Sequence, residues 1–157
     1  MTSIIKVDQI QNAAGGVPTA ADLGLNTAGN VIQVVRATPY ATTVATTTYT
    51  TVASVSITVA QGSSVFALVT GNANFYADGH WHRMRFHRDG TGVGNSIVAV
   101  GSGASHNHAF ALSLVDQGLN AGTYEYTLKV QQGSGSADYG EEGAVDSPQI
   151  TLMEIAG

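Results

Sequence analysis

The segment HWHRMRFHRDG, residues 80–90, concentrates the side chains of this sequence that are best suited to bind a ligand. It holds three of the six Lys and Arg residues and three of the five histidines. In an extended strand, alternate side chains share a face. One face is expected to carry Trp81, Arg83, Arg85 and His87. The opposite face is expected to carry His82, Met84 and Phe86.

The face that carries Trp81 and the arginines is a candidate contact surface. Aromatic rings and guanidinium groups suit both sugars and anionic polymers, so this face predicts recognition of a ligand such as a host surface glycan. Two alternatives stay open. The stripe could be a solvated strand face, or it could pair with acidic residues between Asp138 and Asp146 of a neighbouring subunit.

Two His-x-His pairs are the candidate metal ligands of the chain: His80 with His82, and His106 with His108. Alternate residues of a strand point the same way and can converge on one ion. Two ligands are too few for a closed site, so a metal would require several copies of the chain around an axis. The alternative is a set of polar rim residues, and we expect neither a resident metal nor a cofactor.

No catalytic motif stands out. The stretch GTGVG, residues 90–94, lacks the helix that follows a phosphate-binding loop, and no Gly-x-Ser-x-Gly elbow is present. A glycosidase needs two positioned carboxylates. The available ones are scattered, mostly at turns: Asp78, Asp89, Asp116, Glu125 and Glu154. We therefore expect binding rather than catalysis, with a polysaccharide-cleaving enzyme as a remote alternative.

Composition restricts the class of protein further. The 157 residues suit one domain, and the absence of cysteine excludes disulfides and thiolate metal sites. A net charge of −5 with 11% charged residues argues against nucleic acid as a partner. No apolar run approaches the roughly 20 residues that span a bilayer, and the first residues lack a signal-peptide layout, so we expect a soluble protein without membrane insertion.

The elements that must position these side chains are predicted to be strands. Nineteen glycines, with many threonines and valines, favour an all-β chain. Residues 31–36 form a mostly apolar ribbon that suits burial on both sides. Asp-Gly pairs at 78–79 and 89–90 predict tight hairpin turns. Residues 131–147 are expected to form an acidic, glycine-rich loop outside the core.

About eight to ten such strands spaced by turns predict a β-sandwich or jelly roll over residues 31–157. Residues 1–30 have paired glycines and a proline, and they are expected to form an extended N-terminal arm. Its apolar side chains have no visible core of their own and are the candidate attachment residues: Ile4, Ile5, Val7 and Ile10.

The two ends of the chain carry a resemblance to a known group. SIIKVDQIQNAAGGVPTAADLGLNTAGNVIQVV, residues 3–35, and SPQITLMEIAG, residues 147–157, resemble the small tail-fibre-like virion structural proteins of marine and cyanobacterial tailed phages. The resemblance implies a β-rich homotrimer in the virion, assembled in the host cytoplasm. It also implies an arm that attaches to other capsid or tail proteins, and a body that contacts the host surface.

The chain departs from that group in being short and in having a His-rich strand, and no long shaft is evident in its sequence. An arm with a compact β-rich body therefore also fits a capsid decoration (cement) protein. Such a protein would bind across neighbouring capsomers with its arm and stabilise the head.

Overall fold

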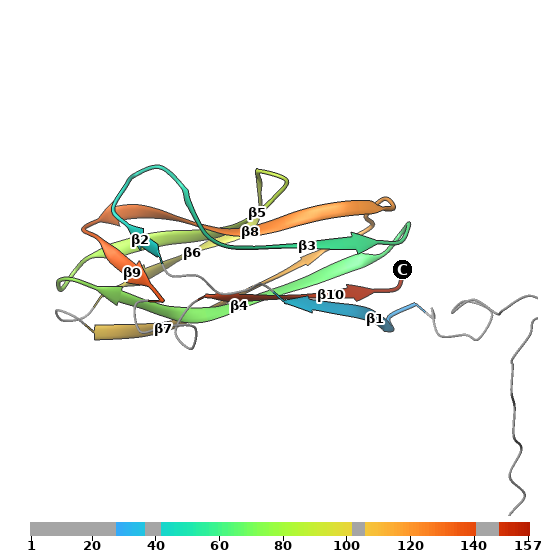
Figure 1. Ribbon diagram of the computed structural model, residues 1–157, viewed down its shortest axis with the longest axis horizontal. Helices are drawn as coiled ribbons and strands as arrows, with labels where there is room; N and C mark the ends of the chain where they lie inside the picture. The colour runs from blue at the N-terminus through green and yellow to red at the C-terminus, as the bar shows by residue number, and fades with distance from the viewer. Residues whose placement is uncertain (1–27, 37–41, 102–105, 141–147) are drawn as a thin grey trace, which may run out of the picture.

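The computed structural model describes residues 28–36, 42–101, 106–140 and 148–157, and within these residues the protein contains strands and no helix. The strands form two antiparallel sheets that lie one above the other (Figure 1). This confirms the predicted all-β class and is consistent with a β-sandwich. The strands of the described residues are β1 (Val31–Arg36), β2 (Thr42–Val44), β3 (Thr50–Val59), β4 (Ser64–Phe75), β5 (Trp81–Arg88), β6 (Thr91–Val100), β7 (His106–Asp116), β8 (Gly122–Ser134), β9 (Ala137–Tyr139) and β10 (Gln149–Ile155).

We call the two layers sheet A and sheet B. Sheet B has the strand order β3-β8-β5-β6, which places β5 inside the sheet between β8 and β6. Sheet A is built around the long strand β4, which pairs with β7 along one edge. Along its other edge β4 pairs first with β10 and then, at Asn74 and Phe75, with β9. Strand β1 pairs with β10, and β2 pairs with β9, which completes the six strands of this sheet.

The core lies between the two sheets and follows from the alternation of side chains along each strand. On β4, the side chains of Val65, Ala67 and Val69 are fully buried, whereas the residues between them face outward. On β8, Tyr126, Leu128 and Val130 are fully buried from the other sheet. Both patterns place one face of each sheet against the shared core.

The predicted turn at Asp89-Gly90 is confirmed as a two-residue hairpin between β5 and β6. Arg88 and Thr91 are paired across it, and both turn residues have positive φ, 48° at Asp89 and 82° at Gly90. Positive φ at both central positions defines the tight turn that matches the twist of antiparallel strands. The turn therefore fixes the register at the start of the β5–β6 pairing.

The expectation that residues 31–36 are buried on both sides is wrong. Val31 is 54% exposed and Val34 is 50% exposed. The reason is position: among the described residues, β1 pairs only with β10, and no third layer covers the outer surface of sheet A. An apolar ribbon can thus occupy an edge strand.

The expectation that residues 131–147 form a loop outside the core is also wrong for the part that the structure describes. Residues 137–139 form β9, which pairs with β2 and β4, and Ala137 and Tyr139 are fully buried. Asp138 tolerates burial because its carboxylate accepts hydrogen bonds from the hydroxyls of Thr43 and Tyr76. Its carboxylate is therefore engaged within its own subunit. Residues 141–147 lie outside the described part.

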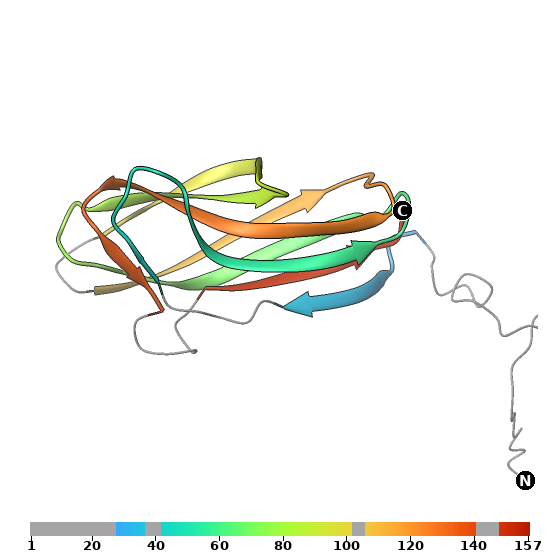
Figure 2. The ribbon, with the colours of Figure 1, turned by 45° about the horizontal axis from the view of Figure 1, so that its top comes forward.

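The predicted arm, residues 1–30, falls mostly outside the described residues, and so do Ile4, Ile5, Val7 and Ile10. Its last residues are hydrogen-bonded to the body. Gly29 N donates to Ala156 O at 2.8 Å, and Ala156 N donates to Asn30 O at 2.9 Å. The start of β1 and the C-terminus therefore lie at the same end of the molecule (Figure 2).

Candidate ligand-binding face

The outer face of sheet B carries the residues that the sequence singled out. The predicted alternation on β5 is confirmed, because His82, Met84 and Phe86 point into the core and are at most 1% exposed. Four further side chains of β5 point outward and are half-buried or exposed: Trp81, Arg83, Arg85 and His87. We call these four side chains, with Lys129 and Tyr49 described below, the sheet B face.

Strand pairing gathers positive charge at the centre of this face. Arg85 is the direct cross-strand partner of Lys129 on β8, and Arg83 lies two residues away along β5. These are three of the six Lys and Arg residues of a chain whose net charge is −5. The ion pair found within the described residues joins Arg88 to Asp116 instead, so none of the three has an acidic partner there. Like charges directly opposite each other destabilise a sheet, and a bound anion would remove that repulsion.

The guanidinium group of Arg85 is held flat against the neighbouring strand. A Cβ atom at Gly92 on β6 would lie 3.0 Å from Cζ of Arg85, so the glycine makes room for the guanidinium. Nη2 of Arg85 donates a hydrogen bond to the carbonyl oxygen of Gly92 at 3.2 Å, while Nε has no partner among the described residues. The group is thus positioned in advance by its contacts with β6.

The indole of Trp81 is positioned in the same way. A Cβ atom at Gly133 on β8 would lie 2.2 Å from Cε3 and Cζ3 of Trp81, so the ring occupies the space that the glycine leaves open. Large rings that cover a glycine of the adjacent strand are a recognised way to stabilise a sheet. The ring is half-buried and provides a fixed aromatic surface at one end of the sheet B face.

The other end of this face is also aromatic. The rings of Tyr49 and His87 meet edge to face with centroids 5.2 Å apart, and Nδ1 of His87 lies 3.0 Å from the carbonyl oxygen of Gly90. Trp81 and His87 are six residues apart on one strand, or about 20 Å at the usual rise per residue. The cations thus lie between two aromatic ends, on a strip long enough for an extended ligand.

Among the described side chains, the histidines of the candidate metal pairs are not gathered as a ligand set. Nδ1 of His82 lies 3.0 Å from Oη of Tyr139, and its Nε2 lies 3.2 Å from the carbonyl oxygen of Gly135. His80 lies over Gly135, His108 packs edge to face on Phe75, and the side chain of His106 is outside the described part. Within the described residues, no group of three or more His, Asp or Glu side chains could hold a metal ion.

Burial determines the protonation of the His82 pair. Desolvation lowers the pKa of His82, which therefore stays neutral in the core. Burial raises the pKa of Tyr139, whose hydroxyl also stays neutral. Because Nε2 of His82 faces a carbonyl oxygen and must carry the proton, the Tyr139 hydroxyl donates to Nδ1. The pair is an internal polar contact that is fully satisfied.

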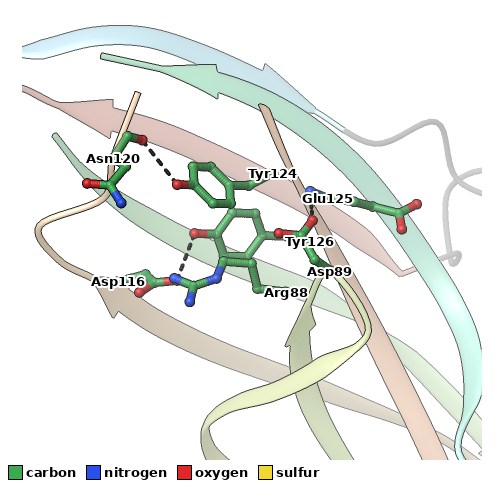
Figure 3. A network of polar contacts seen from close by, with 7 residues as sticks. All are labelled: Arg88, Asp89, Asp116, Asn120, Tyr124, Glu125 and Tyr126. Carbon is green, nitrogen blue, oxygen red and sulfur yellow. Dashed lines mark hydrogen bonds and ion pairs between the residues drawn. The ribbon is translucent and has the colours of Figure 1, made fainter. Parts of the chain in front are cut away.

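A polar network joins the two sheets where β5 and β7 end (Figure 3). Nη1 of Arg88 lies 2.6 Å from Oδ2 of Asp116, and the hydroxyl of Tyr126 donates to the same oxygen at 2.9 Å. The Arg88 guanidinium also lies 5.5 Å from the centroid of the Tyr124 ring. Because Asp116 belongs to sheet A and the others to sheet B, the network links the layers.

The protonation equilibria of this network argue for a structural role. Burial and the hydrogen bond to Asp116 raise the pKa of Tyr126. Desolvation would lower the pKa of Arg88, but the charge and hydrogen bond of Asp116 together with Tyr126 outweigh it and raise that pKa. Both shifts place the pKa values further above neutral pH, so neither group exchanges a proton near pH 7.

Glu154, one of the scattered carboxylates, is occupied inside the protein. It is 2% exposed and accepts hydrogen bonds from Ala60 N at 2.7 Å, Ser63 Oγ at 2.7 Å and Gln33 Nε2 at 2.6 Å. Desolvation would raise its pKa, but these hydrogen bonds lower it overall, so the carboxylate stays charged. It joins β10 to β1 and to the turn between β3 and β4, and it is not presented to a substrate.

Comparison with known proteins adds little to this description. No family model matches the sequence, and no curated protein matches it. Among solved structures, the dimeric latent PorU from Porphyromonas gingivalis aligns with 83% of this chain at 11% identity and a TM-score of 0.37. This chain spans 14% of that protein.

Sequence reasoning identified the β5 residues of the sheet B face but not Tyr49 or Lys129. The alternation on β8 does place Lys129 on the outward side of its strand. Its position opposite Arg85 depends on the register between β5 and β8, which no local pattern specifies.

Proposed function

We propose that the protein is a non-catalytic, tail-fibre-like structural protein of a phage virion. It attaches to capsid or tail proteins by its N-terminal arm and presents, as a homotrimer, the sheet B face to an anionic glycan of the host surface. The observation that carries the binding role is the group Arg83, Arg85 and Lys129, which has no acidic partner among the described residues and is flanked by Trp81. The virion setting follows from the resemblance of residues 3–35 and 147–157.

The chemistry of this face matches an acidic sugar polymer. Guanidinium groups bind carboxylate and sulfate oxygens through paired N–H donors, and a lysine adds a point charge. The indole of Trp81 offers a fixed apolar surface to a sugar ring. Each single contact is weak, so several copies on one particle would supply the avidity that attachment requires.

The test is binding of the full chain to dextran sulfate, with neutral dextran as the matched ligand control. We expect binding to the sulfated polymer alone, weakening with added salt because the contacts are exposed. Arg85→Ala should weaken it by about tenfold, since a charge-assisted hydrogen bond contributes about 1.5 kcal/mol.

Arg36→Ala is the matched protein control, because Arg36 is exposed on the outer surface of sheet A. Equal binding to both polymers, or equal weakening by Arg36→Ala, would contradict the proposed role of the sheet B face.

A capsid decoration protein is the second candidate. The described residues form one two-layer body with no repeating shaft, which suits a compact protein on a shell. A decoration protein should bind empty capsids at high copy number and raise their resistance to heat. Mass spectrometry of separated heads and tails distinguishes the two locations.

A further inference from the structure

The outer surface of sheet A carries a continuous apolar row. Val34 on β1 pairs with Met153 on β10, Met153 pairs with Phe66 on β4, and Phe66 pairs with Val115 on β7. These residues alternate with the buried residues of their strands and therefore all face away from the core. One apolar side chain from each of four neighbouring strands thus lies in line.

Further apolar side chains widen this row into a face. Val31 and Ile155 are paired beside it, and Leu68 lies two residues from Phe66 on the same side of β4. The valines are well exposed, at 50% for Val34, 51% for Val115 and 54% for Val31. We call these residues the sheet A face: Val31, Val34, Phe66, Leu68, Val115, Met153 and Ile155.

The sheet A face is poor in charge. Among the described residues of β1, β4, β7 and β10, the outward-facing positions carry one charged side chain, Arg36, at the end of β1. The carboxylates of these strands are used elsewhere, Glu154 in the core and Asp116 in the ion pair with Arg88. A contiguous apolar surface of this kind marks a site of protein association.

We propose that copies of this chain pack against one another through the sheet A face. Two chains of net charge −5 repel each other, and a face that is nearly free of charge is where they can approach closely. The row is also contiguous across all four strands, which span about 19 Å at about 4.8 Å spacing, and the seven residues of β10 extend about 23 Å along it, so the projected surface is on the order of 400 Å² per copy. That lies within the roughly 300 to 600 Å² of surface patches that are often functional.

This inference rests on the homo-oligomer of the proposed function and assigns its surface. Copies that pack through sheet A turn the sheet B face of each subunit outward, because the two faces lie on opposite sides of the body. In a homotrimer the sheet A face would line the threefold axis, and the ligand-binding faces would point away from it.

The test is the mass of the full chain in solution, measured by light scattering after size-exclusion chromatography, with no ligand present. We expect a multiple of the 16.1 kDa chain mass. Val34→Glu with Val115→Glu should give single chains, because each subunit would then place two uncompensated carboxylates in the interface. Val98→Glu with Val100→Glu is the matched control, since these valines of β6 are 51% and 56% exposed on sheet B, and it should leave the mass unchanged.

Single chains in the parent protein would overturn the inference, as would an unchanged mass in the sheet A variant or dissociation of the control. This assay does not measure glycan binding. A negative result would therefore contradict the oligomer interface and leave the proposed binding role of the sheet B face unaffected. Circular dichroism checks that the variants fold.

A milder comparison avoids adding charge. The chain has no cysteine, so Val115→Cys and Val98→Cys each introduce one thiol at equal exposure in the single chain. We expect several-fold slower maleimide labelling at 115 than at 98 in the oligomer. Equal rates would contradict the interface.

Discussion

At the scale of single residues, the division of polar side chains between the core and the sheet B face defines what each can do. Arg83, Arg85 and Lys129 are left without carboxylate partners in the described residues, whereas Arg88 is fully engaged with Asp116. A cation that is paired with a carboxylate uses its donors within the fold, whereas a cation without such a partner can bind an anionic ligand. Arg88 therefore stabilises the fold, and the other three are available for binding.

His82 predicts a pH dependence of stability. Burial lowers its pKa in the folded protein below 6.5, so in the range just below that value the unfolded chain binds a proton that the folded protein does not. The stabilisation that His82 provides is complete above pH 6.5 and is lost as the pH falls towards the folded-state pKa. The free energy of unfolding in urea should therefore decrease between about pH 7.5 and about pH 5.5.

His82→Gln should flatten this pH dependence, because glutamine does not titrate. His87→Gln, a change on the outward side of the same strand, should leave the dependence in place. An equal slope for the parent protein and His82→Gln would show that His82 is not its source.

At the scale of elements, glycines determine how the side chains of β5 lie on their neighbours. Gly92 of β6 lies under the Arg85 guanidinium, and Gly133 of β8 lies under the Trp81 indole. Both residues are in strands, where glycine costs stability because it packs no side chain. The cost is offset here by the large groups that cover them.

Gly133→Ala should displace the Trp81 ring from β8. The new methyl group would stand 2.2 Å from the ring carbons, and the ring must move because the backbone of a paired strand cannot. Since Trp81 is the only tryptophan, its fluorescence reports the change directly, and we expect emission at longer wavelength as the ring becomes more exposed. Binding to dextran sulfate should also weaken, although every cation is retained.

Gly122→Ala is the matched control for this substitution. It lies in the same strand, and its added methyl group would make only ordinary contact with the Tyr124 ring at 3.9 Å. Its tryptophan emission should equal that of the parent protein. Unchanged emission in Gly133→Ala would contradict the packing of Trp81 on β8.

At the scale of the whole molecule, the two outer surfaces differ in chemistry. The sheet B face carries three cations between two aromatic ends, with the exposed Val98 and Val100 beside it on β6, whereas the sheet A face is apolar and nearly free of charge. We infer that the first suits a charged ligand and the second a protein surface. The arm joins the body where β1 begins, beside the C-terminus (Figure 2). We thus propose separate parts of the chain for attachment, oligomerisation and ligand binding.

Deletion of residues 1–12 tests this separation. The deletion removes Ile4, Ile5, Val7 and Ile10, whose burial on a partner would contribute on the order of 6 to 10 kcal/mol before the cost of ordering the segment. We expect loss of incorporation into virus particles, measured by quantitative mass spectrometry, with the thermal unfolding temperature of the body unchanged. Unchanged incorporation, or a destabilised body, would contradict the role of the arm.

The sequence by itself determined the all-β class, the hairpin at Asp89-Gly90 and the two faces of β5. These features depend on local chemistry: strand-forming composition, turn residues that accept positive φ, and an alternation with a period of two. The residues Trp81, Arg83, Arg85 and His87 could therefore be assigned to one surface before any contact was known.

Only the tertiary structure decided which of those faces is covered and what lies beside each residue. Alternation gives two sides of a strand but does not say whether a second layer exists, so the exposure of Val34 on β1 was not predictable. Register brings Lys129 to Arg85, and contacts from distant segments allow Asp138 and Glu154 to be buried. Glu154 and its partner Gln33 are 121 residues apart, and such pairings are fixed by the packing of whole strands.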